Sequence, residues 1–353
     1  MRTHLHKKRQ QCSGLIRFQP LLWGMRKAGR LRMPVSCLVA VFFMGCGIAN
    51  AADSPRNAAY FFERAIATKP KTDEIAERIR ISKGIDPNQM TELSGMHEAD
   101  MFPVDTEAGD DFQDEAYAQL RAEIRMTYAE LASARCQADE VRRSLELLRK
   151  LVEMSNTLYA NGKIDQSQAL KTQIEWERLS QDLLLLEKQE QIFAIRLNVL
   201  TGDALEGVIP PLQSLPEYAP ALNVRELVEA YKSRLFLAAF AQAANPSASP
   251  ATGEELHGLH STDLESNAFI SISKVSLENL SLHARHYRLA LIPRAEQAHT
   301  ARMEAFETGK VDFSALLEGL REVSVMRREY QALLGEMHVL KAHVESMTGV
   351  TLD

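Results

Sequence analysis

The sequence has few of the features that support disulfide bonding or a membrane crossing by a helix. Only four of its 353 residues are cysteine, and Cys136 is the single one beyond residue 51. A disulfide within that later part of the chain is excluded, because one thiol has no partner. The longest apolar run, Val35–Ile48, is too short for a transmembrane helix, which needs about 20 residues.

The sequence also lacks a surplus of basic charge and any recognisable catalytic motif. Beyond residue 51 it carries 32 basic and 47 acidic residues, a formal charge of −15. This balance argues against nucleic acid and anionic lipid as partners. No nucleophile elbow, phosphate-binding loop or convergent set of His, Asp and Ser is present. We therefore expect neither an enzyme nor a bound cofactor.

The first 51 residues differ in composition from the rest. They contain nine Lys or Arg and no acidic residue, and their apolar run is followed by the small-residue pattern Ala49-Asn50-Ala51. A basic flank, a short apolar stretch and a small-residue cleavage site of this kind are typical of a secretory signal peptide, here residues 1–51. Two alternatives stay open: lipidation at Cys46, and a true start at Met25 or Met33. The protein is thus expected to be exported.

One sequence unit occurs twice, 147 residues apart. The first copy, Leu158–Asp165, contains a Tyr, Gly, Lys, Ile and Asp that align with a Phe, Gly, Lys, Val and Asp in the second copy, Ala305–Asp312. Each copy is followed 40 residues after its glycine by a Thr-Gly pair that ends at Gly202 or Gly349. Such self-similarity indicates that one supersecondary unit is used twice.

The repeated unit reads as a long helical hairpin. From Tyr117 to Tyr159 apolar or small residues recur at steps of three and four, which predicts one long coiled-coil helix. Gly162 is suited to end this helix, and Asp165 is suited to start the next. The returning helix has a second apolar stripe and should therefore have neighbours on two sides; this stripe comprises Ile174, Leu184, Ile192, Ile195 and Val199.

The predicted organisation has five parts. After the signal peptide come short helices and an acidic loop (52–112), hairpin 1 (113–202), a connector with one helix and a flexible loop (203–267), and hairpin 2 (268–353). The loop is expected at Asn245–Asn267, rich in Ser, Pro, Gly and Thr. A short strand is possible at Asn267–Val275, and Pro293 predicts a kink or a fresh helix start near Leu291. The fold class is all-α: two long antiparallel coiled-coil hairpins in tandem repeat, joined by a mixed connector.

Two residue sets could suggest metal binding. Pairs of His spaced i, i+3 can share an ion, but neither pair here has a Cys or a clear carboxylate partner; they are His257/His260 and His283/His286. Methionines could suggest a copper path, yet three of them occupy seam positions, where core packing explains them better; the set is Met303, Met326, Met337 and Met347. We expect no resident metal.

The two hairpins carry a family resemblance. An aromatic-x-x-Gly turn between long helices, with a return helix ending in Leu200-Thr201-Gly202 or Met347-Thr348-Gly349, resembles the TolC-like outer-membrane efflux proteins. The similarity covers Ala116–Gly202 and Leu289–Gly349, and more weakly Leu222–Ala244.

The resemblance implies an exported homotrimer in the outer membrane or periplasm of a Gram-negative bacterium. Its hairpins would form a periplasmic tunnel, and the hairpin tips would dock a periplasmic adaptor protein of an inner-membrane pump. A small β-barrel of four strands per chain would carry the tunnel through the outer membrane. By position, the docking residues are Gly162, Lys163, Ile164, Asp165, Gly309, Lys310, Val311 and Asp312.

The sequence departs from the family pattern in two ways. Where many members have an acidic residue six positions past the tip glycine, this chain has Gln168 and Ala315, so an acidic constriction is not expected there. Strands of about 9 to 11 alternating residues are not evident before either hairpin, which predicts a shortened member with little or no β-barrel.

Two functions are compatible with these features. The first is a conduit component of a tripartite efflux system, or one like type I secretion. The alternative is a barrel-less periplasmic coiled-coil protein with a structural or adaptor role and no pore of its own.

Overall fold

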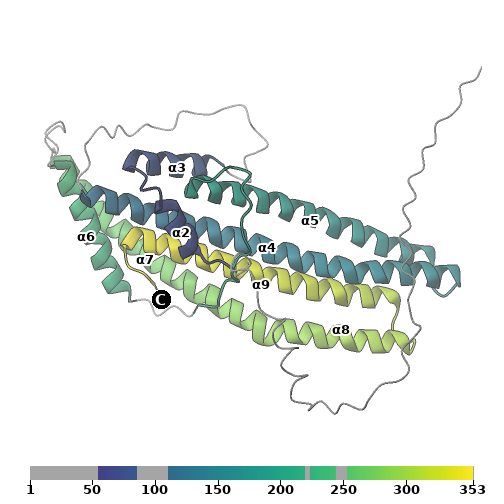
Figure 1. Ribbon diagram of the computed structural model, residues 1–353. Coiled ribbons are helices and arrows are strands. Elements are labelled where there is room, and N and C mark those ends of the chain that lie inside the picture. Colours follow the sequence, from purple (N-terminus) through teal and green to yellow (C-terminus); the bar gives the residue numbers. More distant parts are fainter. Residues whose placement is uncertain (1–54, 86–109, 219–222, 244–252, 353) are drawn as a thin grey trace, which may run out of the picture. The chain divides into compact units, whose positions relative to one another are not determined.

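The computed structural model describes residues 55–85, 110–218, 223–243 and 253–352 (Figure 1). The expected signal peptide, with Cys46 and both alternative start sites, lies outside these ranges, as does most of the expected acidic loop. The described residues are mainly helical, and their one β-pairing is an isolated parallel bridge between Arg56 and Leu212. The all-α prediction is confirmed.

Hairpin 1 consists of α4 (Asp110–Ala160) and α5 (Gln166–Thr201), and both helices are uninterrupted. Neither contains Gly or Pro, the residues that most strongly disfavour a helix interior. At 1.5 Å per residue, the 51 residues of α4 extend for about 76 Å. Most positions of the predicted α4 seam are buried, including Leu120, Leu131 and Val141.

Hairpin 2 has an interrupted first helix. It runs through α7 (Gly253–His286), a π-helical turn η2 (Tyr287–Leu291) and α8 (Ile292–Glu307), and returns in α9 (Phe313–Thr348). Pro293 lies in the first turn of α8, directly after the π-helical turn. Proline cannot donate the backbone hydrogen bond that an unbroken helix needs there. The predicted irregularity near Leu291 is confirmed.

The helical hairpins pack through α4 and α9. Helix α4 contacts α5 on one side and α9 on another, while α9 also contacts α7 and α8. An ion pair joins Arg125 to Glu345, and a second joins Glu140 to Arg327 at 3.7 Å. Residue numbers increase along α4 while those of the partner residues on α9 decrease, so these two helices are antiparallel. The order of packing is α5, α4, α9, α8, with α4 and α9 inside (Figure 1).

The end of the helices away from the tips is covered by the remaining elements. Helices α2 (Ala58–Ile66) and α3 (Thr72–Gly84) bury Phe61 and Ile75 against α4 and α5. Helix α6 (Val224–Ala243) buries Leu227 in a second cluster with α7 and α9. The described residues 202–218, which follow α5, contain no helix and no strand longer than the single bridge that joins Leu212 to Arg56, before α2.

Two sequence expectations on α7 are wrong. Residues 253–267, expected as part of a flexible loop, are helical, and so is the possible strand at Asn267–Val275. Among the described side chains of α7, the buried ones are Ile270, Ser273, Leu277 and Ala284, which recur at helical steps of three, four and seven rather than two. Ser, Thr and Asn disfavour a helix only weakly, so the local composition does not prevent one.

The second stripe of α5 is confirmed only in part. Ile192 and Val199 are buried near the end covered by α3, whereas Ile174 and Leu184 lie nearer the tip and are exposed. Within the described chain it is α4 and α9, not α5, that have long helices on two sides.

Candidate functional site at the hairpin tips

The tip of hairpin 1 is a helix end followed directly by a helix start. Gly162 has φ of +65°, its N–H donates to the Tyr159 carbonyl, and the Lys163 N–H donates to the Leu158 carbonyl at 2.9 Å. These bonds form a Schellman motif, which uses glycine because a left-handed residue with a Cβ is strained. The Asp165 carboxylate then accepts from the Gln168 N–H at 2.8 Å and caps α5.

The tip of hairpin 2 repeats this geometry. Gly309 has φ of +71°, and its N–H and that of Lys310 donate to the carbonyls of Phe306 and Ala305. Asp312 accepts from the Ala315 N–H at 3.0 Å. The predicted roles of the two glycines and the two aspartates in local structure are therefore confirmed. These roles in the local structure explain the two glycines and the two aspartates without a binding partner.

The other tip residues are available for contact. At both tips the glycine, lysine and aspartate are exposed, while Ile164 and Val311 are half-buried. No atom of the described chain lies within 4 Å of where a Cβ would stand on Gly162 or Gly309. Each tip thus presents one amine, one carboxylate and one β-branched side chain to its surroundings. A docking role for these eight residues stays a prediction.

The two tips lie at the same end of the layer (Figure 1). Helices α5 and α9 are joined by Glu175 to Arg321 at 3.7 Å and by Asp182 to Arg328 at 2.9 Å. Both pairs join residues 146 positions apart, within one residue of the 147-residue spacing of the tips. The returning helices therefore run parallel and nearly in repeat register, which places the two turns side by side. The sequence analysis missed these ion pairs.

The tips differ just below their turns. In hairpin 2, Phe306 and Phe313 form an edge-to-face pair with ring centroids 5.7 Å apart, and Phe313 is buried. The positions equivalent by the 147-residue spacing are Tyr159 and Gln166, both exposed. Neutral side chains at Gln168 and Ala315 leave these two positions without an acidic group, as the sequence indicated.

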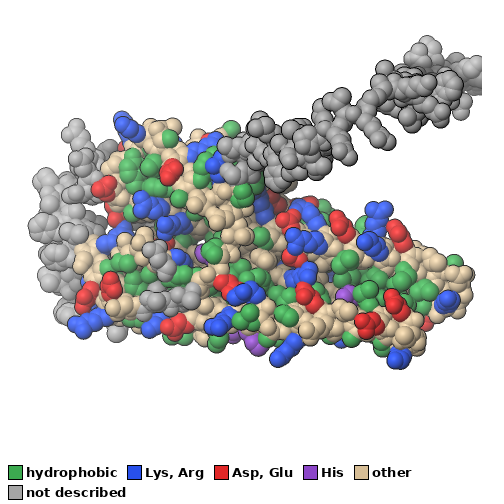
Figure 2. Space-filling model, turned by 60° about the horizontal axis from the view of Figure 1, so that its bottom comes forward, with side chains coloured by type: hydrophobic (Ala, Val, Ile, Leu, Met, Phe, Trp, Pro, Cys, Tyr) green, Lys and Arg blue, Asp and Glu red, His purple; other side chains and the backbone are tan. Residues whose placement is uncertain are grey.

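The outer helices of the layer each carry exposed apolar residues on one face. On α5 four of them lie within about 100° of one another at 100° per residue; they are Leu170, Ile174, Leu184 and Leu185, whereas the exposed Trp176 lies on another side of the helix. On α7 and η2 the corresponding residues are Ile272, Val275, Leu282 and Leu289. Figure 2 shows a face on which hydrophobic side chains and charged side chains of both signs are interspersed. Apolar side chains exposed in this way commonly mark contact surfaces.

The alternative sites of the sequence find no support in the described residues. No group of three or more His, Cys, Asp or Glu able to hold a metal ion occurs there. His283 and His286 are exposed, while the side chains of His257 and His260 lie outside the description. Met337 is fully buried in the core cluster of α6, α7 and α9, which confirms its packing role. Among described helices, none is both long and apolar enough to span a membrane.

The fold is that of TolC-like outer-membrane channels. No family model matches the sequence, and no curated protein matches it either. Several solved structures resemble it, CusC and OprN among them. CusC, known for conformational changes that accompany folding and transmembrane channel formation, aligns with a TM-score of 0.53 at 12% identity, over 83% of this chain and 95% of that one. The outer-membrane channel OprN aligns with a TM-score of 0.51 at 13% identity, over 83% and 89%. At such identities the likeness establishes the fold alone.

Proposed function

We propose that this chain is a conduit component of a tripartite efflux system, or of a related secretion system, in a Gram-negative cell envelope. It assembles with further copies of itself into a helical tunnel and acts without chemistry of its own. The observation that carries this proposal is the pair of exposed apolar faces on the two outer helices, α5 and α7.

The helix directions at the two edges suit such a contact. Helix α5 runs away from the tips, whereas α7 and α8 run towards them, so a neighbouring copy that places its α7–α8 edge beside α5 continues the alternation of helix directions. The exposed apolar residues of α5 lie nearer the tip than those of α7 and η2, and the two sets overlap in height only around Leu185 and Leu289. Because the two faces belong to different helices, the contact is heterologous, and heterologous contacts close into rings when the rotation allows. The number three comes from the family resemblance.

The tips then provide the docking face for a periplasmic adaptor protein of an inner-membrane pump. Two turns with the same backbone geometry lie at one end of the layer, and a ring of copies multiplies them around its axis. Each tip offers Lys163 or Lys310 next to a capping aspartate whose carboxylate already accepts a backbone hydrogen bond. The lysine and the β-branched residue are therefore the side chains free to recognise a partner.

Self-association is the first test. The native mass of the chain without residues 1–51 should be a multiple of the monomer, and Ile174→Glu with Leu184→Glu should reduce it to the monomer. Leu205→Glu, an exposed leucine outside the long helices, is the matched control and should leave the mass unchanged. A monomeric parent protein that fractionates as a soluble periplasmic species would instead match the alternative, a structural or adaptor protein without a pore.

Docking is tested separately. A photo-crosslinking residue at position 163 or 310 should capture an adaptor that mass spectrometry identifies, and the capture should be reproduced with that adaptor in purified form. The same residue at Lys188, exposed on α5 far from the tip, is the control. Equal capture at all three positions, or none with the purified adaptor, would contradict docking at the tips.

A further inference from the structure

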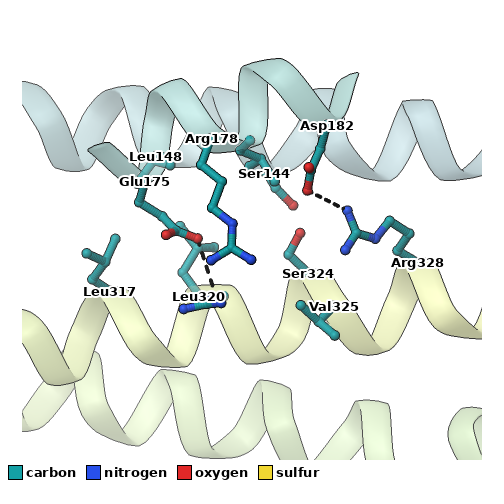
Figure 3. A pocket seen from close by; sticks show the side chains of 12 residues that line it. Ser144, Leu148, Glu175, Arg178, Asp182, Leu317, Leu320, Ser324, Val325 and Arg328 are labelled. Carbon is teal, nitrogen blue, oxygen red and sulfur yellow. Dashed lines mark hydrogen bonds and ion pairs between the residues drawn. The ribbon is translucent and has the colours of Figure 1, made fainter. Parts of the chain in front are cut away.

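A small cavity lies where both hairpins meet, between α4, α5 and α9. Its volume is about 50 Å³, and Figure 3 shows that side chains from all three helices reach it. Its apolar walls include Leu148, Leu179 and Leu320. These walls exclude water on one side of the cavity, and on the other side it is open to solvent, where Arg178 is exposed and the Arg321 side chain is 50% exposed.

The charged groups that line this cavity do not balance. Three arginines and two carboxylates face it: Arg178, Arg321, Arg328, Glu175 and Asp182. Both carboxylates pair across the cavity with an arginine of α9. Arg178 lies between them on α5, three residues after one carboxylate and four before the other. In the described part of the chain Arg178 has no ion-pair partner of its own, so the cavity has a surplus of one positive charge.

An unpartnered hydroxyl group is aimed into the same space. Ser324 on α9 is only 8% exposed, and among the described residues its hydroxyl has no hydrogen-bond partner. Ser144 on α4 faces it across the cavity but donates its hydroxyl proton to the Glu140 carbonyl (Figure 3). An acceptor inside the cavity would give the Ser324 hydroxyl a hydrogen-bond partner.

We propose that this cavity binds a small oxyanion of the size of sulfate or phosphate. The guanidinium of Arg178 and the hydroxyl of Ser324 donate to its oxygens, and the surplus positive charge attracts it. On the scale of roughly 10–15 Å³ per enclosed water, the cavity has room for a few heavy atoms, which excludes a nucleotide. Since Arg178 belongs to hairpin 1 and Ser324 to hairpin 2, the bound anion ties the two hairpins together. This proposal is independent of docking at the tips.

The test is titration calorimetry of the purified chain without residues 1–51. Sodium sulfate and sodium phosphate are titrated separately at constant ionic strength, with sodium chloride as the reference anion. At least one oxyanion should bind saturably with one site per chain and should raise the melting temperature more than chloride does. Arg178→Gln should weaken that binding at least about tenfold, because a charged donor contributes more than a neutral one.

Two further variants separate binding from folding. Lys171→Gln removes another exposed cation of α5, outside the cavity, and should bind the oxyanion like the parent protein. Ser324→Ala removes the unpartnered hydroxyl, so it should fold at least as stably as the parent without the oxyanion and yet bind the oxyanion more weakly. Binding no stronger than that of chloride, or equal losses in the Arg178 and Lys171 variants, would overturn the proposal.

Discussion

Replacement of Gly335 by Ala tests the closest approach between the two hairpins. Gly335 on α9 faces Ser133 on α4, and a Cβ at position 335 would lie 2.5 Å from both the Cβ and the Oγ of Ser133. The Ser133 hydroxyl also donates to the Gln331 carbonyl of α9 at 2.9 Å. Because the Cβ of Ser133 is fixed to the α4 backbone, a rotamer change cannot relieve the clash. The helices must move apart.

The expected decrease in the free energy of unfolding of Gly335→Ala is the sum of three contributions. Overpacking of a well-packed contact costs about 1–3 kcal/mol, and a strained or broken Ser133 hydrogen bond costs about 0.5–1.5 kcal/mol more. Against this, Ala favours a helix over Gly by about 0.8–1.0 kcal/mol. Gly335→Ala should therefore lower the free energy of unfolding by about 1–3 kcal/mol.

Urea unfolding followed by circular dichroism at 222 nm measures this change. Gly84→Ala is the matched control, since Gly84 ends α3 with no atom within 4 Å of a Cβ; this variant should be unchanged or slightly more stable. Combining Gly335→Ala with Ser133→Gly removes the clashing Cβ. The double variant should therefore lose less free energy of unfolding than the sum of the two single variants, by more than about 1 kcal/mol. A Gly335→Ala protein as stable as the parent would refute the close approach of α4 and α9.

Three further predictions concern single groups. Asp165→Ala and Asp312→Ala should each lower the free energy of unfolding by about 1 kcal/mol, while Asn, an equally good cap, should cost little; equal losses with Ala and Asn in urea unfolding would contradict the capping role. Burial lowers the pKa of His338, so the folded state binds its proton less readily than the unfolded chain. The free energy of unfolding should be highest above the pKa of the unfolded chain, about 6.5, and should decrease as the pH falls through that value. Between pH 7.5 and 5.5 the urea midpoint of His338→Gln should therefore fall less than that of the parent protein. Burial also raises the pKa of the Cys136 thiol. At pH 8 the Cys136 thiol should therefore react with iodoacetamide more slowly than the thiol of free glutathione does, and the two rates should become equal in urea.

The long helices and their turns could be predicted from the sequence because their determinants are local. An unbroken heptad pattern without Gly or Pro gives α4, and Asp after a Gly-Lys-β-branched turn gives the N-caps of α5 and α9. Gly162 and Gly309 have the positive φ that their positions indicated. A capping or periodic signal acts within a few residues, so it is legible without knowledge of the rest of the fold.

The candidate docking residues show the limit of such inference. The sequence placed all eight at the two turns, and the structure shows six of them exposed there and the two β-branched ones half-buried. The same pattern cannot distinguish a turn that only joins two helices from one that also binds a partner, because glycine and aspartate serve both purposes. The cavity at Arg178 gave no sequence signal at all, since its lining comes from three helices far apart in the chain.

What the sequence determined by itself is therefore the two helices of hairpin 1, the returning helix of hairpin 2 and the turns that reverse them. Only the tertiary structure decided which apolar stripe meets which neighbour. It placed α4 and α9 inside and left Ile174 and Leu184 exposed. The physical reason is that periodicity states only that a face is apolar, whereas its partner depends on contacts between residues as far apart as Ser133 and Gly335.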